Sequence, residues 1–167
     1  RRKVTNQDTR NIINEIRSIQ PDIAIRTTML VGFPGETRDD IEQLKEFIEE
    51  MRFERLGVFT YSHEEGTHGY KLEDTLTPEE KTERANEIME MQQEISMELN
   101  DAKVGKTFKV LFDRKEGEHF VGRTEYDSPD VDNEVLIDAK KEYIAVGSFA
   151  QVKIVDATDF DLFGELV

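Results

Sequence analysis

Cysteine and tryptophan are absent from the 167 residues. Without thiols the chain cannot build a disulfide framework, a thiolate zinc site, a cysteine nucleophile or a cysteine-held iron–sulfur cluster. Long hydrophobic runs are missing too, since no stretch approaches the roughly 20 apolar residues that cross a bilayer. We therefore expect a cytoplasmic chain with no membrane partner, and the start without methionine indicates a segment of a longer protein.

Positive charge is scarce as well. The sequence has 22 Lys and Arg residues against 37 Asp and Glu residues, which gives a formal net charge of −15. Such a balance disfavours tight binding to a nucleic-acid backbone or an anionic membrane and favours a basic partner. The hydrophobic share of 37%, with ten Phe and four Tyr, is enough for the core of one domain or two small ones.

The first hundred residues alternate amphipathic helices with short apolar segments. Each predicted helix starts with a threonine followed three residues later by a carboxylate, which is typical of a capping box. The first apolar segment is rich in Ile, Thr and Val and predicts a strand buried on both faces. Helix, strand, helix and strand with short links indicate parallel βαβ connectivity. The expected elements are a helix over 5–20, strands over 23–31 and 56–61, a helix over 37–51, a polar loop over 62–76 and a long helix from residue 77.

The pattern changes near Asn100, where short segments with alternating apolar positions replace the helices. Turns of Gly, Asp and Asn separate the segments, and five short strands in succession predict a small antiparallel barrel of the OB type. The expected fold is therefore α/β over residues 1–102, followed by a small all-β barrel over residues 103–167. The five segments are 108–112, 119–123, 134–137, 149–154 and 162–167.

The sharpest local feature is the turn at residues 32–37, where the first apolar segment breaks at two glycines into a capped helix. Ligands bind at the carboxyl ends of strands in parallel α/β folds, because glycine permits close backbone approach and a helix start has free N–H groups. The turn lacks the sequence of a P-loop and of a dinucleotide-binding glycine motif. On the spacing alone, a structural turn and a ligand site, such as one for a nucleoside, both remain open.

Charged residues near this turn have two interpretations each. Arg26 lies in an apolar strand, so it either pairs with a carboxylate or ligand or reaches solvent at the strand end. Glu36 either binds a hydroxyl pair, such as that of a ribose, or favours the following helix by its charge. The HEEGTH segment at 63–68 lacks zinc-protease spacing, so it forms either a loop over an active site or an exposed acidic turn. The basic run at residues 1–3 is more typical of a solvated chain end than of a site, and no catalytic triad or metal cluster is visible.

Six short segments of the chain carry a resemblance to a known family: RKVT at 2–5, IRTT at 25–28, VGFPGET at 31–37, FTYSHEEGT at 59–67, VG at 104–105 and VGR at 121–123. In this order they resemble the later half of the radical S-adenosylmethionine methylthiotransferases, and the similarity covers essentially the whole chain. GFPGET is shared across that family. The YSHEEGT loop is closer to the RimO-type branch, which modifies a ribosomal protein, than to the MiaB branch, which usually has SPRPGT and modifies transfer RNA.

The resemblance implies a parent enzyme with an amino-terminal cluster-binding domain, a partial TIM-like radical barrel and a TRAM domain, which is an OB-like barrel. Only the later strands of the radical barrel and the TRAM domain would be present here. The implied cofactors are S-adenosylmethionine and two 4Fe–4S clusters, whose cysteine ligands this segment lacks, so it has no catalytic residues and should be inactive alone. By analogy, the candidate cofactor-binding residues are Arg26, Thr28, Leu30, Gly32, Phe33, Glu36, Val58, Phe59 and Thr60.

The RimO-type interpretation also implies a partner and a reaction. The partner would be a basic small-subunit ribosomal protein, S-twelve, and the reaction would be methylthiolation of the β-carbon of one of its aspartates. Residues 101–167 contain nine Lys and Arg against fifteen Asp and Glu, so the TRAM domain would attract that partner, and strong nucleic-acid binding is not expected. The alternatives are a MiaB-like tRNA methylthiotransferase and a non-catalytic TRAM or OB binding module.

Overall fold

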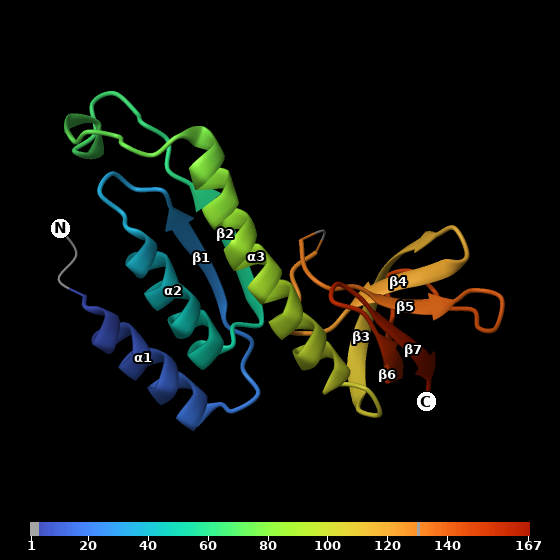
Figure 1. Ribbon diagram of the computed structural model, residues 1–167. Helices are drawn as coiled ribbons and strands as arrows, with labels where there is room; N and C mark the ends of the chain where they lie inside the picture. The colour runs from blue at the N-terminus through green and yellow to red at the C-terminus, as the bar shows by residue number, and fades with distance from the viewer. Residues whose placement is uncertain (1–3, 130) are drawn as a thin grey trace. The chain divides into compact units, whose positions relative to one another are not determined.

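The computed structural model describes residues 4–129 and 131–167, and these residues form two compact units that divide after Ile95. The first unit is an α/β segment and the second is a five-stranded β-barrel (Figure 1). The predicted fold class is therefore confirmed. The domain boundary expected after residue 102 stays a prediction, and the basic run at residues 1–3 lies outside the described residues.

Capping boxes start the three α-helices, as the sequence predicts. At each start a threonine hydroxyl accepts the N–H of the residue three positions later, whose carboxylate accepts the threonine N–H. Each box satisfies two N–H groups that the start of a helix leaves free. The elements are α1 (Asn6–Ile19), β1 (Arg26–Val31), α2 (Arg38–Met51), β2 (Arg55–Thr60), the 3₁₀ helix η1 (Gly69–Lys71) and α3 (Pro78–Asp101), whose last turn belongs to the barrel unit.

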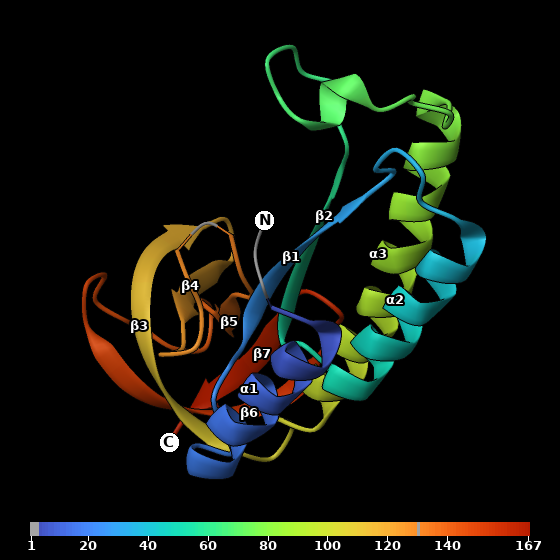
Figure 2. The same ribbon diagram turned by 90° about the vertical axis from the view of Figure 1, so that its left-hand side faces the viewer.

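Strands β1 and β2 pair in parallel, with Thr28 opposite Gly57 and Leu30 opposite Phe59. Figure 2 shows α2 and α3 along one face of the two strands. The side chains of β1 alternate between exposed and half-buried until Val31, and Leu30 and Phe59 are 53% and 66% exposed. The prediction of a strand buried on both faces is therefore wrong, because within the described residues helices cover only one face of this pair.

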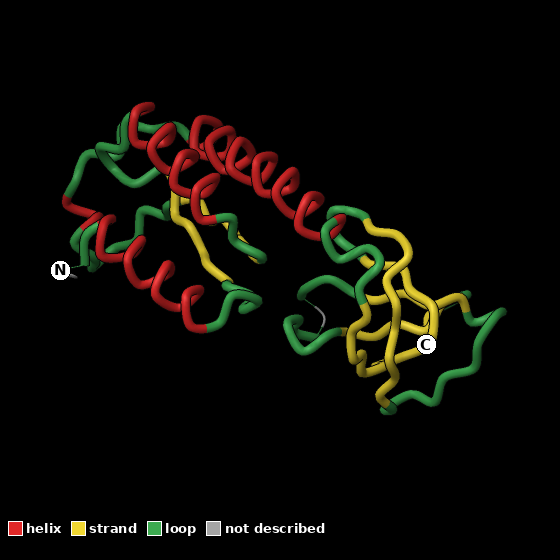
Figure 3. The backbone as a smooth tube through the Cα atoms, turned by 90° about the horizontal axis from the view of Figure 1, so that it is seen from below, coloured by secondary structure: helices red, strands yellow, loops and turns green. Residues whose placement is uncertain are grey.

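The second unit is a closed barrel with the strand order β3-β4-β5-β7-β6. All neighbouring pairs are antiparallel except β5 and β7, which are parallel. The prediction of a wholly antiparallel barrel is wrong in this pair, because a closed ring with an odd number of strands cannot alternate direction throughout. The strands, yellow in Figure 3, are β3 (Thr107–Glu116), β4 (His119–Arg123), β5 (Val135–Asp138), β6 (Phe149–Ala157) and β7 (Leu162–Leu166).

Inward-facing side chains from all five strands fill the barrel. They alternate with outward-facing residues, both polar and apolar, which is the alternation expected of a small barrel without a lumen. In the described part of the chain, no helix combines the length and the apolar character needed to cross a membrane. The strand residues of the core are Val110, Phe112, Phe120, Val135, Ile137, Val152, Ile154, Ala157 and Leu162.

Candidate functional site

Two glycines form the turn that follows β1. Gly32 and Gly35 have φ angles of +78° and +89°, in the left-handed region that side chains disfavour. A Cβ added to Gly32 would lie 2.5 Å from Cγ of Lys81, whereas one added to Gly35 would meet no atom within 4 Å. The structure therefore requires glycine at position 32 for two reasons: the backbone conformation and the close passage of the Lys81 side chain.

Glu36 is held by the backbone and by an arginine of α3. Its Oε1 atom accepts the N–H of Gly32 at 2.9 Å and Nη1 of Arg84 at 2.6 Å. Arg84 Nη1 also donates to the backbone oxygen of Glu36 at 3.1 Å, and the two side chains are only 12% and 13% exposed. Removing one partner of such a pair leaves a poorly solvated charge, so both residues are needed together. The ion pair with Arg84 adds a third role to the two that the sequence left open.

Lys81 is a buried cation beside the same turn. Its Nζ atom lies 2.5 Å from Oδ2 of Asp74 and 5.2 Å from the ring centroid of Tyr61. The hydrogen bond from Lys81 lowers the pKa of the Asp74 carboxyl from its ordinary value of 3.8, and partial burial opposes this shift. The methylenes of Lys81 pack on Gly32 while its charge is compensated by Asp74, so this lysine supports the turn without leaving an unpaired charge.

Aromatic rings connect the turn to the loop over residues 62–76. Phe33 and Tyr61 meet edge to face with their centroids 5.1 Å apart, and His63 lies 4.7 Å from Tyr70. Gly69 is buried, and a Cβ there would lie 2.5 Å from the Tyr61 hydroxyl. The six residues of the HEEGTH segment are all exposed, and His63 contacts the rings of Tyr61 and Tyr70.

The nine predicted cofactor-binding residues fall into three groups. The face of β1 and β2 that α2 and α3 leave uncovered, which we call the open face, consists by the register of Arg26, Thr28, Leu30, Arg55, Gly57 and Phe59. The first group is the four predicted residues on this face, Arg26, Thr28, Leu30 and Phe59. The second group, Gly32, Phe33 and Glu36, lies in the turn. The third, Val58 and Thr60, alternates to the helix side of β2. The structure thus brings four of the nine together on one face, and their role in binding stays a prediction.

The sequence analysis missed Lys81, Arg84, Asp74 and Tyr61, which surround the turn. A lysine and an arginine among the glutamates of a long helix are typical of a solvated face. One signal was available for the lysine, because Lys81 precedes the buried Ile88 by seven residues and so lies on the apolar stripe of α3.

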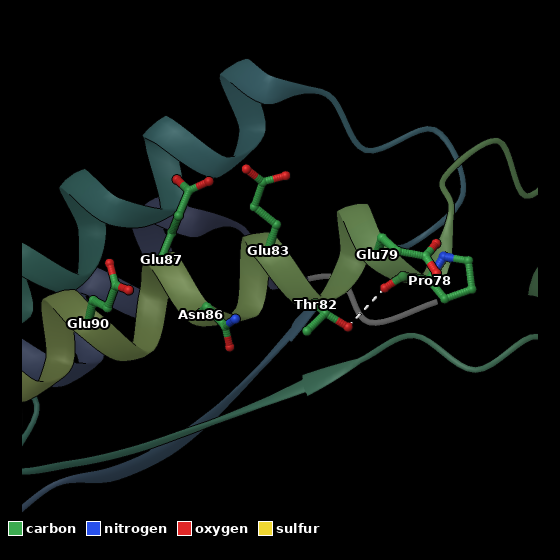
Figure 4. A pocket seen from close by; sticks show the side chains of 7 residues that line it. All are labelled: Pro78, Glu79, Thr82, Glu83, Asn86, Glu87 and Glu90. Atoms are coloured by element: carbon green, nitrogen blue, oxygen red, sulfur yellow. Dashed lines mark hydrogen bonds between the residues drawn. The ribbon is translucent and has the colours of Figure 1, made fainter.

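A hollow of about 590 Å³ lies along α3, lined by Pro78, Glu79, Thr82, Glu83, Asn86, Glu87 and Glu90. Figure 4 shows Glu83 and Glu87 pointing toward α2, and the Thr82 hydroxyl bound to the backbone oxygen of Pro78. Arg38 donates to Glu87 and lowers the pKa of its carboxyl. None of the nine predicted residues lines this hollow, so we do not place the candidate site there.

The Lys81–Asp74 pair predicts a pH-dependent contribution to stability. Because the pKa of Asp74 is lower in the folded chain, its contribution is present above about pH 3.8 and is lost as the pH falls through the folded-state pKa. We expect Asp74→Asn to lower the melting temperature at pH 7, and the difference from the wild type to be smaller at pH 3, below the ordinary pKa of 3.8. Glu73→Gln, an exposed neighbour, is the control; an equal difference for Asp74→Asn at both pH values would contradict the prediction.

Comparisons with known proteins agree on one family. Residues 104–167 match the model of the TRAM domain. The whole chain is similar to curated proteins named ribosomal protein uS12 methylthiotransferase RimO: 59% identical over 165 residues to that of Christiangramia forsetii, 58% over 167 residues to that of Cytophaga hutchinsonii and 50% over 168 residues to that of Phocaeicola vulgatus. These matches cover 99–100% of this chain, which spans 37–39% of the length of the relatives.

Proposed function

We propose that this chain is part of an enzyme that methylthiolates an aspartate of uS12. The premise is that the chain belongs to the ribosomal protein uS12 methylthiotransferase family and spans a portion of its members that includes a TRAM domain. The observation that carries the proposal is an identity that runs through the α/β unit as well as the barrel. A TRAM domain alone would leave the reaction open, because one fold serves many functions.

We assign S-adenosylmethionine to the open face and to the turn after β1. Leu30 and Phe59 offer an exposed apolar surface of the kind on which an adenine stacks, and the hydroxyl of Thr28 lies on the same face. An apolar stacking surface beside a hydroxyl group fits the base and the polar sugar of a nucleoside. Arg84 and the N–H of Gly32 occupy the Oε1 atom of Glu36, so a hydroxyl of the ribose would have to bind its other carboxylate oxygen.

The chain's own part in this reaction is to bind and orient the cofactor. S-adenosylmethionine supplies the methyl group and the radical chemistry when it is bound. Leu30 and Phe59 exclude water from one side of the bound cofactor. The turn at Gly32, supported by Lys81, fixes the position of the carboxyl end of β1. The two 4Fe–4S clusters of the proposed enzyme need cysteines from outside these 167 residues, which contain none.

The charge of residues 101–167 supports a basic partner. Fifteen acidic residues against nine basic ones in residues 101–167 attract a cationic polypeptide and repel a nucleic-acid backbone. This favours uS12 over a transfer RNA as the substrate.

Mass spectrometry of uS12 tests the proposal. We expect the methylthio mass to disappear from uS12 in a strain that lacks the gene for this chain, and to return when the wild-type gene is restored. A gene with Phe59→Ser should restore modification at least about fivefold more slowly, since a base–aromatic contact contributes roughly 1–3 kcal/mol. Phe160→Ser, an equally exposed phenylalanine of the barrel unit (67%), is the matched control.

Three outcomes would contradict parts of this proposal. Unchanged uS12 in the deletion strain overturns the reaction, and a methylthio group lost from transfer RNA instead identifies the other branch. Full-rate modification with Phe59→Ser leaves the reaction standing and overturns the cofactor site on the open face.

A further inference from the structure

Arg84 reaches the turn after β1 from α3. Its Nη1 atom donates to Oε1 and to the backbone oxygen of Glu36, at 2.6 and 3.1 Å. Within the described residues, the hydrogen bonds recorded for Arg84 all go to Glu36. The Arg84 side chain is 12% exposed, so a poorly solvated guanidinium holds a single residue of the turn.

The peptide group between Val31 and Gly32 is held at both of its polar atoms. The Gly32 N–H donates to Oε1 of Glu36 at 2.9 Å, and the Val31 carbonyl accepts the N–H of Tyr61 at 2.8 Å. Because a peptide group is planar, fixing its N–H and its C=O fixes the orientation of the whole group. Glu36 therefore helps to set the direction in which the chain leaves β1.

Lys81 lies one turn before Arg84 on the same helix. Its methylenes occupy the space that a Cβ at Gly32 would need. Helix α3 thus fixes the turn in two ways, by packing at Gly32 and by an ion pair at Glu36. Figure 2 shows α3 on the covered face of β1 and β2, so Arg84 acts on the open face without lying on it.

We propose that Arg84 is a positioning residue of the cofactor site. Through Glu36 it fixes the peptide group between Val31 and Gly32, and with it the places of Leu30 and Phe33, which precede and follow that group. In this role the charge of Glu36 holds the turn, and no hydrogen bond from Glu36 to the ribose is needed. The inference rests on the proposed function, because it takes the open face and the turn as the cofactor site.

The charges of the pair allow this role to be separated from a direct contact with the ligand. Arg84→Gln leaves a carboxylate at position 36 that is only 13% exposed and has lost its counter-ion, so Glu36 turns toward water and releases the Gly32 N–H. The double variant Glu36→Gln with Arg84→Gln removes both charges, and the new amide carbonyl can accept the same N–H. A positioning role therefore predicts that the second substitution repairs the first.

Cofactor affinity tests the proposal on the full-length protein that contains this chain, with S-adenosylmethionine as the probe in equilibrium dialysis. We expect Arg84→Gln to weaken binding about tenfold, and the double variant to bind within about threefold of the wild type. Arg84→Lys keeps the charge but loses the guanidinium fork, so about threefold weaker binding is expected, and it replaces Arg84→Gln if that variant does not fold.

Arg10→Gln is the matched control. Arg10 is also poorly exposed, at 20%, and its Nε lies 2.7 Å from Oε2 of Glu50, which joins α1 to α2. The Arg10 pair shares no partner with the turn, so the affinity should stay within about twofold of the wild type. An equal loss with Arg10→Gln and Arg84→Gln would mean that any broken ion pair of this unit weakens binding, and would overturn the positioning role.

Amide exchange of Gly32 reads the same contact without the cofactor. We expect Arg84→Gln to speed exchange at Gly32 about tenfold while the protected amides earlier in β1 stay within about twofold, because only the Gly32 N–H loses its acceptor. The double variant should restore the slow exchange. Equal acceleration throughout β1 would show a general loss of stability and would overturn the proposal.

Two binding results would also overturn it. Wild-type affinity in Arg84→Gln and Arg84→Lys shows that the turn holds its position without Arg84. A double variant that binds as weakly as Arg84→Gln shows that a charge of the pair contacts the ligand directly.

The failure of this inference can be told from the failure of the proposed function. If Arg84→Gln binds S-adenosylmethionine like the wild type while uS12 loses its methylthio group in the deletion strain, the positioning role is wrong and the reaction stands. If the variants bind as expected while uS12 is unchanged in that strain, Arg84 positions the cofactor of a different reaction. A wild-type protein that binds no S-adenosylmethionine overturns the cofactor assignment and this inference together.

Discussion

Gly32→Ala should destabilise the α/β unit by about 2–6 kcal/mol. A φ of +78° is strained for any residue with a Cβ, at a cost of roughly 1–3 kcal/mol. The new methyl group would also lie 2.5 Å from Cγ of Lys81, a buried side chain that Asp74 holds in place. Forcing such a group aside costs about 1–3 kcal/mol more. Amide hydrogen exchange of β1 and β2 measures the effect within this unit.

Gly35→Ala separates the two causes. Gly35 has a similar φ of +89°, but nothing lies within 4 Å of its added Cβ. We expect this variant to show only the backbone strain, about 1–2 kcal/mol. If the two variants have the same effect, Lys81 moves aside freely and does not support the turn.

Asn100→Ala should destabilise the barrel unit by about 2–4 kcal/mol. Asn100 is fully buried in the last turn of α3. Its Nδ2 donates to the backbone oxygen of Thr158 at 2.8 Å, and its Oδ1 accepts from Asn133 at 2.8 Å and from Lys103 at 3.1 Å. Alanine leaves these groups without their partner, and each buried polar group so left costs roughly 1–3 kcal/mol.

Asn86→Ala is the matched control for this variant. Asn86 lies in the same helix but is exposed, so the exchange removes no buried partner and raises the helix propensity by about 0.5 kcal/mol. The difference between the two variants, measured by amide exchange of the barrel strands, therefore isolates the network around Asn100. A difference below about 1 kcal/mol would mean that water replaces the asparagine.

The barrel strands and the helix starts could be predicted because their causes are local. Each capping box joins residues three positions apart, and each strand follows from alternating apolar residues between turns. The largest error in extent is at β3, which runs from Thr107 to Glu116 rather than over residues 108–112. It keeps pairing with β4 beyond an irregularity between Phe112 and Arg114, and such an irregularity disturbs the alternation on which the prediction depends.

The candidate site was predicted only in part. The family resemblance names Arg26, Thr28, Leu30 and Phe59 as candidates, and only the strand register shows that they share one face of β1 and β2. The supporting residues Lys81 and Arg84 come from a helix that begins more than forty positions after the turn. Glutamates surround them in the sequence, and so their contact with Gly32 and Glu36 has no local signature.

By itself, the sequence determined the order of the elements, the helix starts, the two-part fold class and the resemblance to the methylthiotransferases. These properties depend on residues that are close together in the chain or on the series of motifs. Only the tertiary structure decided that one face of β1 is open, that Glu36 is paired with Arg84 and that β5 and β7 pair in parallel. Each of these depends on how whole elements pack, which brings together residues that no local pattern connects.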